Sequence, residues 1–111
     1  MAVVQLSWQD NANNETHFKI YQDTTSPISA SSTQIAEVRL VSGIWVASET
    51  TTGSAPNISL DSTNSTDATE VGETFVVTFE ESVAGDYYFG VSAGNSVGDS
   101  DIVTSSQLTI A

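Results

Sequence analysis

Short runs of alternating apolar and polar residues recur along this chain of 111 residues, and no segment shows helical periodicity. In such a run every second side chain points to the same face, which is typical of half-buried β-strands. The clearest runs are 3–8, 17–21, 75–80, 87–93 and 102–110, and weaker ones lie at 33–40, 43–48 and 57–60. About eight short strands joined by turns predict an all-β sandwich.

The same alternation gives a candidate core. The inward face of the first run holds Val4, Leu6 and Trp8, and the length of the chain suits one domain over residues 1–111. There is no cysteine, so neither disulfides nor thiolate metal sites are available to stabilise the fold. The structural core is expected to contain Trp8, Phe18, Ile20, Tyr87, Phe89 and Val91.

Two segments of the chain resemble the fibronectin type III family. Residues 4–24, VQLSWQDNANNETHFKIYQDT, resemble strand B, the BC loop and strand C, with Trp8 at the position of the family's core tryptophan. Residues 84–100, AGDYYFGVSAGNSVGDS, resemble strand F and the FG turn, and Tyr87 matches the tyrosine whose hydroxyl bonds to backbone at the E–F corner. The resemblance implies a fibronectin type III or immunoglobulin-like sandwich of about seven to eight antiparallel strands.

The chain departs from this family in two places. Its first strand begins almost at Met1, so strand A is missing from the pattern, and the C′–E region at residues 40–72 is enlarged. Without strand A, one edge of the first strand is uncovered, and Val3, Val4, Gln5 and Leu6 form a candidate assembly edge. Either the segment 41–61 folds back to cover this edge, or the edge pairs with a strand from another molecule.

The charge balance excludes several partners. Fourteen acidic residues face only Lys19 and Arg39, which gives a net charge of −12. Binding to nucleic acid or to an anionic membrane depends on Lys and Arg, so neither is expected.

The chain offers few residues for catalysis or metal binding. His17 is the single histidine, and its position on the strand face opposite Phe18 and Ile20 predicts an exposed side chain rather than a catalytic one. No catalytic residue and no cofactor are therefore expected. Two acidic loops are weak calcium candidates, but neither has the ligand spacing of an EF-hand, so no metal is expected. Their oxygen ligands would be Asp10, Asn13 and Glu15 in one loop, and Asp99 and Asp101 in the other.

The resemblance also suggests a function, because phage particles commonly display immunoglobulin-like and type III domains. It implies a non-catalytic virion component, made in the host cytoplasm, such as a capsid decoration protein or a tail or fibre protein. Its partner would be a capsid or tail protein, with self-association as a further option. The alternative is an extracellular accessory module that binds carbohydrate or a surface, as part of a secreted bacterial enzyme or adhesin.

The charge excess predicts a salt effect. Added sodium chloride screens the repulsion among the excess carboxylates, so the melting temperature should rise from low to moderate salt. Thermal unfolding at a series of salt concentrations measures this. A steady fall would show instead that ion pairs of Lys19 and Arg39 outweigh the repulsion.

Overall fold

The chain folds into nine described strands and no described helix. The computed structural model describes residues 2–9, 16–29, 31–49, 58–62, 74–81 and 84–110. The strands are β1 (Ala2–Gln9), β2 (His17–Asp23), β3 (Thr33–Val41), β4 (Ile44–Glu49), β5 (Ser59–Ser62), β6 (Thr74–Glu81), β7 (Gly85–Gly94), β8 (Val103–Thr104) and β9 (Leu108–Ile110).

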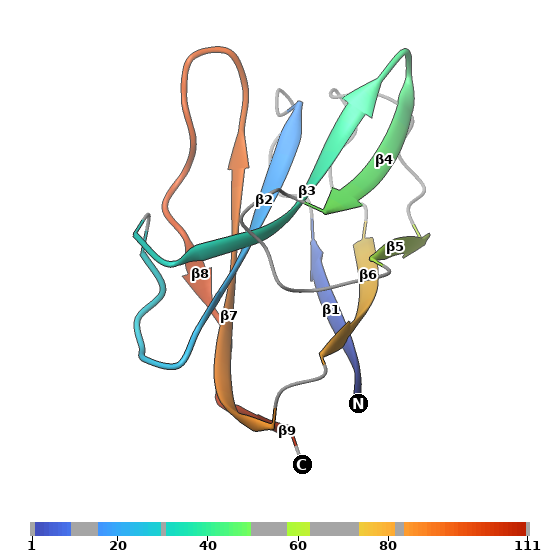
Figure 1. Ribbon diagram of the computed structural model, residues 1–111. Helices are drawn as coiled ribbons and strands as arrows, with labels where there is room; N and C mark the ends of the chain where they lie inside the picture. Colours follow the sequence, from blue (N-terminus) through green and yellow to red (C-terminus); the bar gives the residue numbers. More distant parts are fainter. Residues whose placement is uncertain are drawn as a thin grey trace.

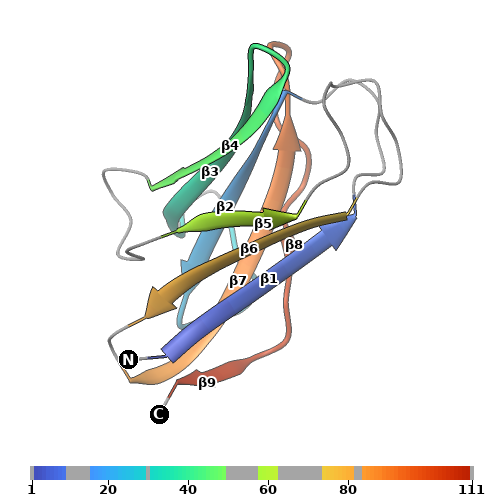
Figure 2. The same cartoon turned by 90° about the vertical axis from the view of Figure 1, so that its right-hand side faces the viewer.

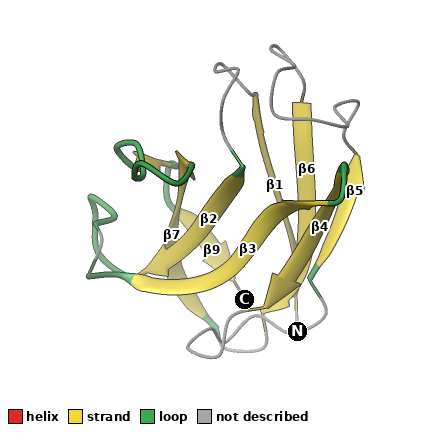
Figure 3. Ribbon diagram, turned by 90° about the horizontal axis from the view of Figure 1, so that it is seen from above, coloured by secondary structure: helices red, strands yellow, loops and turns green. Residues whose placement is uncertain are grey.

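These strands form two antiparallel sheets. One has the order β1-β6-β5, and the other has the order β4-β3-β2-β7-β8, with β9 also paired to β7 (Figure 1). In Figure 2 the strands β1, β6 and β5 cross in front of β2 and β7, and Figure 3 shows the two layers from above. The all-β fold is thus confirmed, and the arrangement is consistent with a fibronectin type III or immunoglobulin-like sandwich.

Aromatic side chains from both sheets fill the space between them. Phe75 of β6 is fully buried, and its ring centroid lies 4.8 Å from that of Phe18 on β2 and 5.1 Å from that of Trp45 on β4. Trp8 of β1 stacks on Phe75 at 5.6 Å with an interplanar angle of 9°. Aromatic pairs at such separations add to the free energy gained by burying their surface.

The expected core residues differ in how deeply they are buried. Phe18, Ile20, Tyr87 and Phe89 belong to the buried core cluster, whereas Trp8 and Val91 are only partly buried against it. For Trp8 the reason is its place on β1, which has a described neighbour, β6, on one side alone. The bond from the Tyr87 hydroxyl to backbone stays a prediction.

The enlarged region supplies two strands, but neither covers β1. A two-residue turn at Ser42 and Gly43, with φ of 51° and 80°, joins β3 to β4. Positive φ at both positions is the geometry of tight hairpin turns that match strand twist. β4 therefore pairs with β3, and β5 pairs with β6. Residues 50–57 of the segment lie outside the described part of the chain.

The prediction of a single last strand over residues 102–110 is wrong, because this segment forms two short strands. β8 pairs with Gly90 and Val91, and β9 pairs with residues 85–87. Between them, the Phe89 amide donates to the Ser105 hydroxyl at 3.0 Å, and the Ser105 amide donates to the Phe89 carbonyl at 2.7 Å. The serine side chain replaces a backbone acceptor here, which interrupts the ladder.

Truncating the central aromatic residue tests this packing. Phe75→Ala should lower the free energy of unfolding by about 3–5 kcal/mol, because it leaves a cavity between the sheets. As a control, Ile44→Ala, at a side chain that is 66% exposed, should cost less than about 1 kcal/mol. Equilibrium denaturation in urea measures both, and equal effects would contradict the assigned core.

Candidate functional site

The outer edge of β1 is the most distinctive feature of the smaller sheet. β1 pairs with β6 along its whole length, from Ala2 opposite Glu81 to Gln9 opposite Thr74. No strand in the described part of the chain pairs with its other edge. Since alternate residues of an antiparallel edge strand direct both backbone groups outward, about four N–H and four C=O groups are available for pairing.

This edge has none of the features that usually prevent strands from associating. Natural edge strands are kept short, charged, bulged or interrupted by proline. β1 is eight residues long, contains no charged residue and no proline, and pairs with β6 without a register shift. Its outward-facing Val3 side chain is 73% exposed. As far as the described residues go, the edge is therefore open to strand addition.

The other edges of the two sheets differ from β1. β5 has four residues and pairs with β6 through a register shift, whereas β8 has two residues. β4 is longer, and its outward face exposes Ile44 and Val46. Its inward Trp45 is only 6% exposed, although the indole Nε1 has no hydrogen-bond partner, so the core is better covered along β4 than along β1.

Among the described residues, the core is not closed along β1. Val4 is buried, but the inward-facing Leu6 and Trp8 are only partly buried. Their partners on β6, Val77 and Phe75, are fully buried. The Trp8 indole Nε1 is also buried without a hydrogen-bond partner, and burying an unpaired polar group costs free energy. An additional strand beside β1 would cover both side chains.

His17 is buried, which corrects the prediction of an exposed side chain. It is 8% exposed, and its Nε2 lies 2.7 Å from Asp99 Oδ1. Lys19 Nζ donates to the other carboxylate oxygen of Asp99 at 2.7 Å. Asp99 reaches them because the turn after β7 folds over β2, where a Cβ at Gly94 would overlap Asp99 Oδ1 and His17 Nε2. The absence of a side chain at Gly94 makes this contact possible.

These contacts bear on the loop at residues 99–101 as a candidate calcium site, because they involve Asp99. Hydrogen bonds from Lys19 and then His17 lower the pKa of the Asp99 carboxyl, and the bond to Asp99 raises the pKa of Lys19. Both Asp99 oxygens are therefore engaged within the fold, one in a hydrogen bond with His17 and the other in an ion pair with Lys19. In the described residues no three acidic or histidine side chains gather as metal ligands. Asp10, Asn13 and Glu15 lie outside the described residues.

The lysine and the arginine of the protein lie on the same face of the larger sheet as His17. His17 is directly opposite Arg39 in the β2–β3 pairing, and Lys19 is opposite Glu37. Arg39 also pairs with Glu37 at 2.7 Å. Because Lys19 and Arg39 each contact a carboxylate on this face, it is locally near neutral in a chain of net charge −12.

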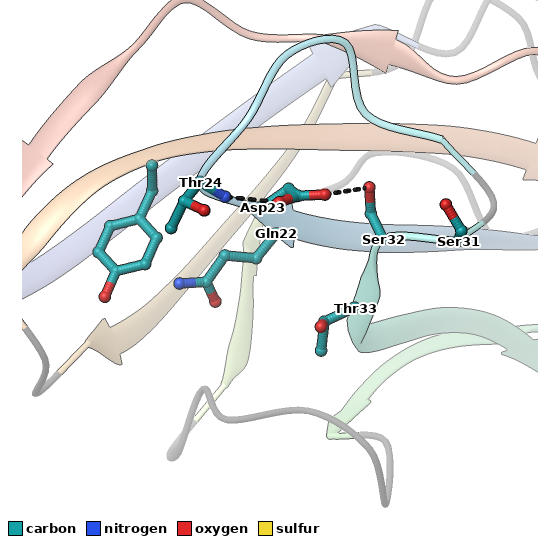
Figure 4. Close-up of a pocket in the computed structure, with 7 residues that line it drawn as sticks. Gln22, Asp23, Thr24, Ser31, Ser32 and Thr33 are labelled. Atoms are coloured by element: carbon teal, nitrogen blue, oxygen red, sulfur yellow. Dashed lines mark hydrogen bonds between the residues drawn. The ribbon is translucent and has the colours of Figure 1, made fainter.

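A polar pocket of about 390 Å³ lies where β2 ends and β3 begins (Figure 4). Gln22, 7% exposed, donates through Nε2 to the buried Glu81 at 3.1 Å, and its Oε1 has no partner. Asp23 accepts a hydrogen bond from the Ser32 hydroxyl at 2.8 Å. The pocket is lined by Gln22, Asp23, Thr24, Ser31, Ser32, Thr33 and Tyr87.

Sequence reasoning missed both the ion pair and the pocket. Gln22 continues the inward alternation of Phe18 and Ile20, so a polar residue at a core position was a visible signal. The contact between His17 and Asp99 joins residues 82 positions apart, and no local pattern reveals it. The expected assembly residues Val3, Val4, Gln5 and Leu6 do lie together on the unpaired edge.

Comparison with family models, curated proteins and solved structures gives no match. Among the described residues there is no helix that could span a membrane.

The ion pair of Asp99 predicts a pH dependence. A carboxyl whose pKa is lower in the folded than in the unfolded chain stabilises the fold above the unfolded pKa, and this contribution is lost as the pH falls through the folded pKa. Asp99→Asn should therefore lower stability at neutral pH, and the difference from wild type should shrink below about pH 4. Denaturation curves between pH 7 and 2 measure it, with Asp101→Asn as the control. A constant difference across this range would contradict the ion pair.

Proposed function

We propose that this protein is a non-catalytic module that attaches to a larger protein assembly through the edge of β1. The observation that carries the proposal is a long, uncharged edge strand whose outer side has no neighbour among the described strands. Strand addition at such an edge supplies affinity through main-chain hydrogen bonds, and side-chain contacts supply specificity. A binding role of this kind requires no catalytic residue.

The favoured assembly is a phage virion, in which the protein would act as a capsid decoration protein or as a tail or fibre protein. This part of the proposal rests on the resemblance of residues 4–24 and 84–100 to fibronectin type III domains. The net charge of −12 is compatible with it, because strong charge keeps an unassembled module soluble until it meets its partner.

The polar pocket favours a second candidate function, carbohydrate binding as an accessory module. The carboxylate of Asp23 and the exposed hydroxyls of Thr24 and Ser31 line the pocket, and such groups suit a ligand rich in hydroxyl groups. The volume of about 390 Å³ falls within the range of small-molecule sites. The pocket lies outside β1, so substitutions can separate the two functions.

Particle association tests the proposed function. The protein should co-sediment with virions from the host culture, and amides of residues 3–8 should exchange more slowly in the particle than in the isolated protein. Residues 44–49 of the other edge serve as the internal control. Equal exchange in both states would overturn attachment through β1. Retention on insoluble polysaccharide that Asp23→Ala abolishes, without co-sedimentation, would favour the second candidate.

A further inference from the structure

We infer that the partner supplies a basic, extended segment with apolar residues at alternate positions, which pairs with β1 and completes the core over Leu6 and Trp8. This inference rests on the proposed function and names the chemistry of its partner. Three features of β1 lead to it: its backbone groups, the incomplete cover of its inward side chains, and the charges around it.

The backbone of β1 defines the shape of the occupant. β1 is straight enough to pair with β6 in one register from Ala2 to Gln9. A partner in any folded form other than a strand would leave the outward N–H and C=O groups unpaired. An extended segment of similar length pairs all of them.

The inward side chains define its apolar pattern. In a strand, alternate residues point to the same face. A segment beside β1 therefore directs every second side chain toward the partly buried Leu6 and Trp8. Apolar residues at those positions would bury the remaining surface of both, at about 25 cal/mol per Å². The residues between them face solvent beside Val3 and are polar.

The charge of the chain defines the sign of the segment. β1 itself is uncharged, in a chain of net charge −12 with fourteen acidic residues against one lysine and one arginine. Lysine or arginine in the segment would be attracted to this excess of negative charge, whereas acidic residues would be repelled. At the ends of the segment such residues leave its apolar alternation undisturbed.

A second copy of this chain fits the edge less well because of its charge. Pairing two copies would bring together two chains of net charge −12, whose repulsion opposes association. A basic partner of different sequence avoids this repulsion.

Synthetic peptides test the inference on the full chain. The first probe is a peptide as long as β1, with alternating valine and threonine and a lysine at each end. The second has the same composition with its valines in one block, and the third has glutamate in place of lysine. The first should bind and slow amide exchange at residues 3–8, with binding at least about tenfold weaker for the other two. Equal binding of all three, or protection elsewhere in the chain, would overturn the inference.

Two variants provide a matched comparison. Leu6→Lys places a charge on the inward face of the edge, a device that natural edge strands use against pairing, and should abolish binding of the first peptide. Val46→Lys places the same charge on β4 and should leave binding unchanged. Circular dichroism establishes that both variants fold. Co-sedimentation with virions but no peptide binding would refute the basic segment and leave the attachment through β1 intact. Peptide binding without co-sedimentation would refute the virion assembly instead.

Discussion

A cluster of four aromatic side chains holds the two sheets together. Trp8 and Phe75 come from the smaller sheet, and Phe18 and Trp45 come from the larger one. The chain has no cysteine for a disulfide, and the described residues contain no cluster of metal-ligating side chains that could supplement this packing. Since β1 and β4 are edge strands, two members of the cluster lie on edges. The stability of the whole sandwich therefore depends in part on Trp8 and Trp45. How far these two side chains are buried depends on what lies beside each edge strand.

The tryptophans of the two edge strands differ in how much of the side chain is buried. Trp45 is enclosed although β4 is an edge strand, whereas Trp8 remains partly exposed. The open edge and the incomplete core thus coincide on β1. In an isolated domain this combination is a liability for aggregation. In a module that assembles, the same surface gains stability from its partner, so folding and attachment are thermodynamically linked.

Alternation of residues was enough to predict the strands and the inward faces of β1, β2, β6 and β7. It could not predict which sheet receives β4 and β5, because pairing depends on strands that are distant in sequence and on the Ser42–Gly43 turn. Nor could it predict that His17 is buried, because its cover comes from Asp99 at the far end of the chain. Local pattern determines the face of a residue, whereas long-range packing determines its exposure.

The placement of both basic side chains on one sheet face has a consequence for long-range approach. Lys19 and Arg39 lie on the face of the larger sheet opposite the core residues Phe18 and Ile20, and each contacts a carboxylate there. Neither is therefore left to offset negative charge elsewhere on a chain of net charge −12. A positively charged molecule would meet a weaker attraction at this face than the net charge alone suggests.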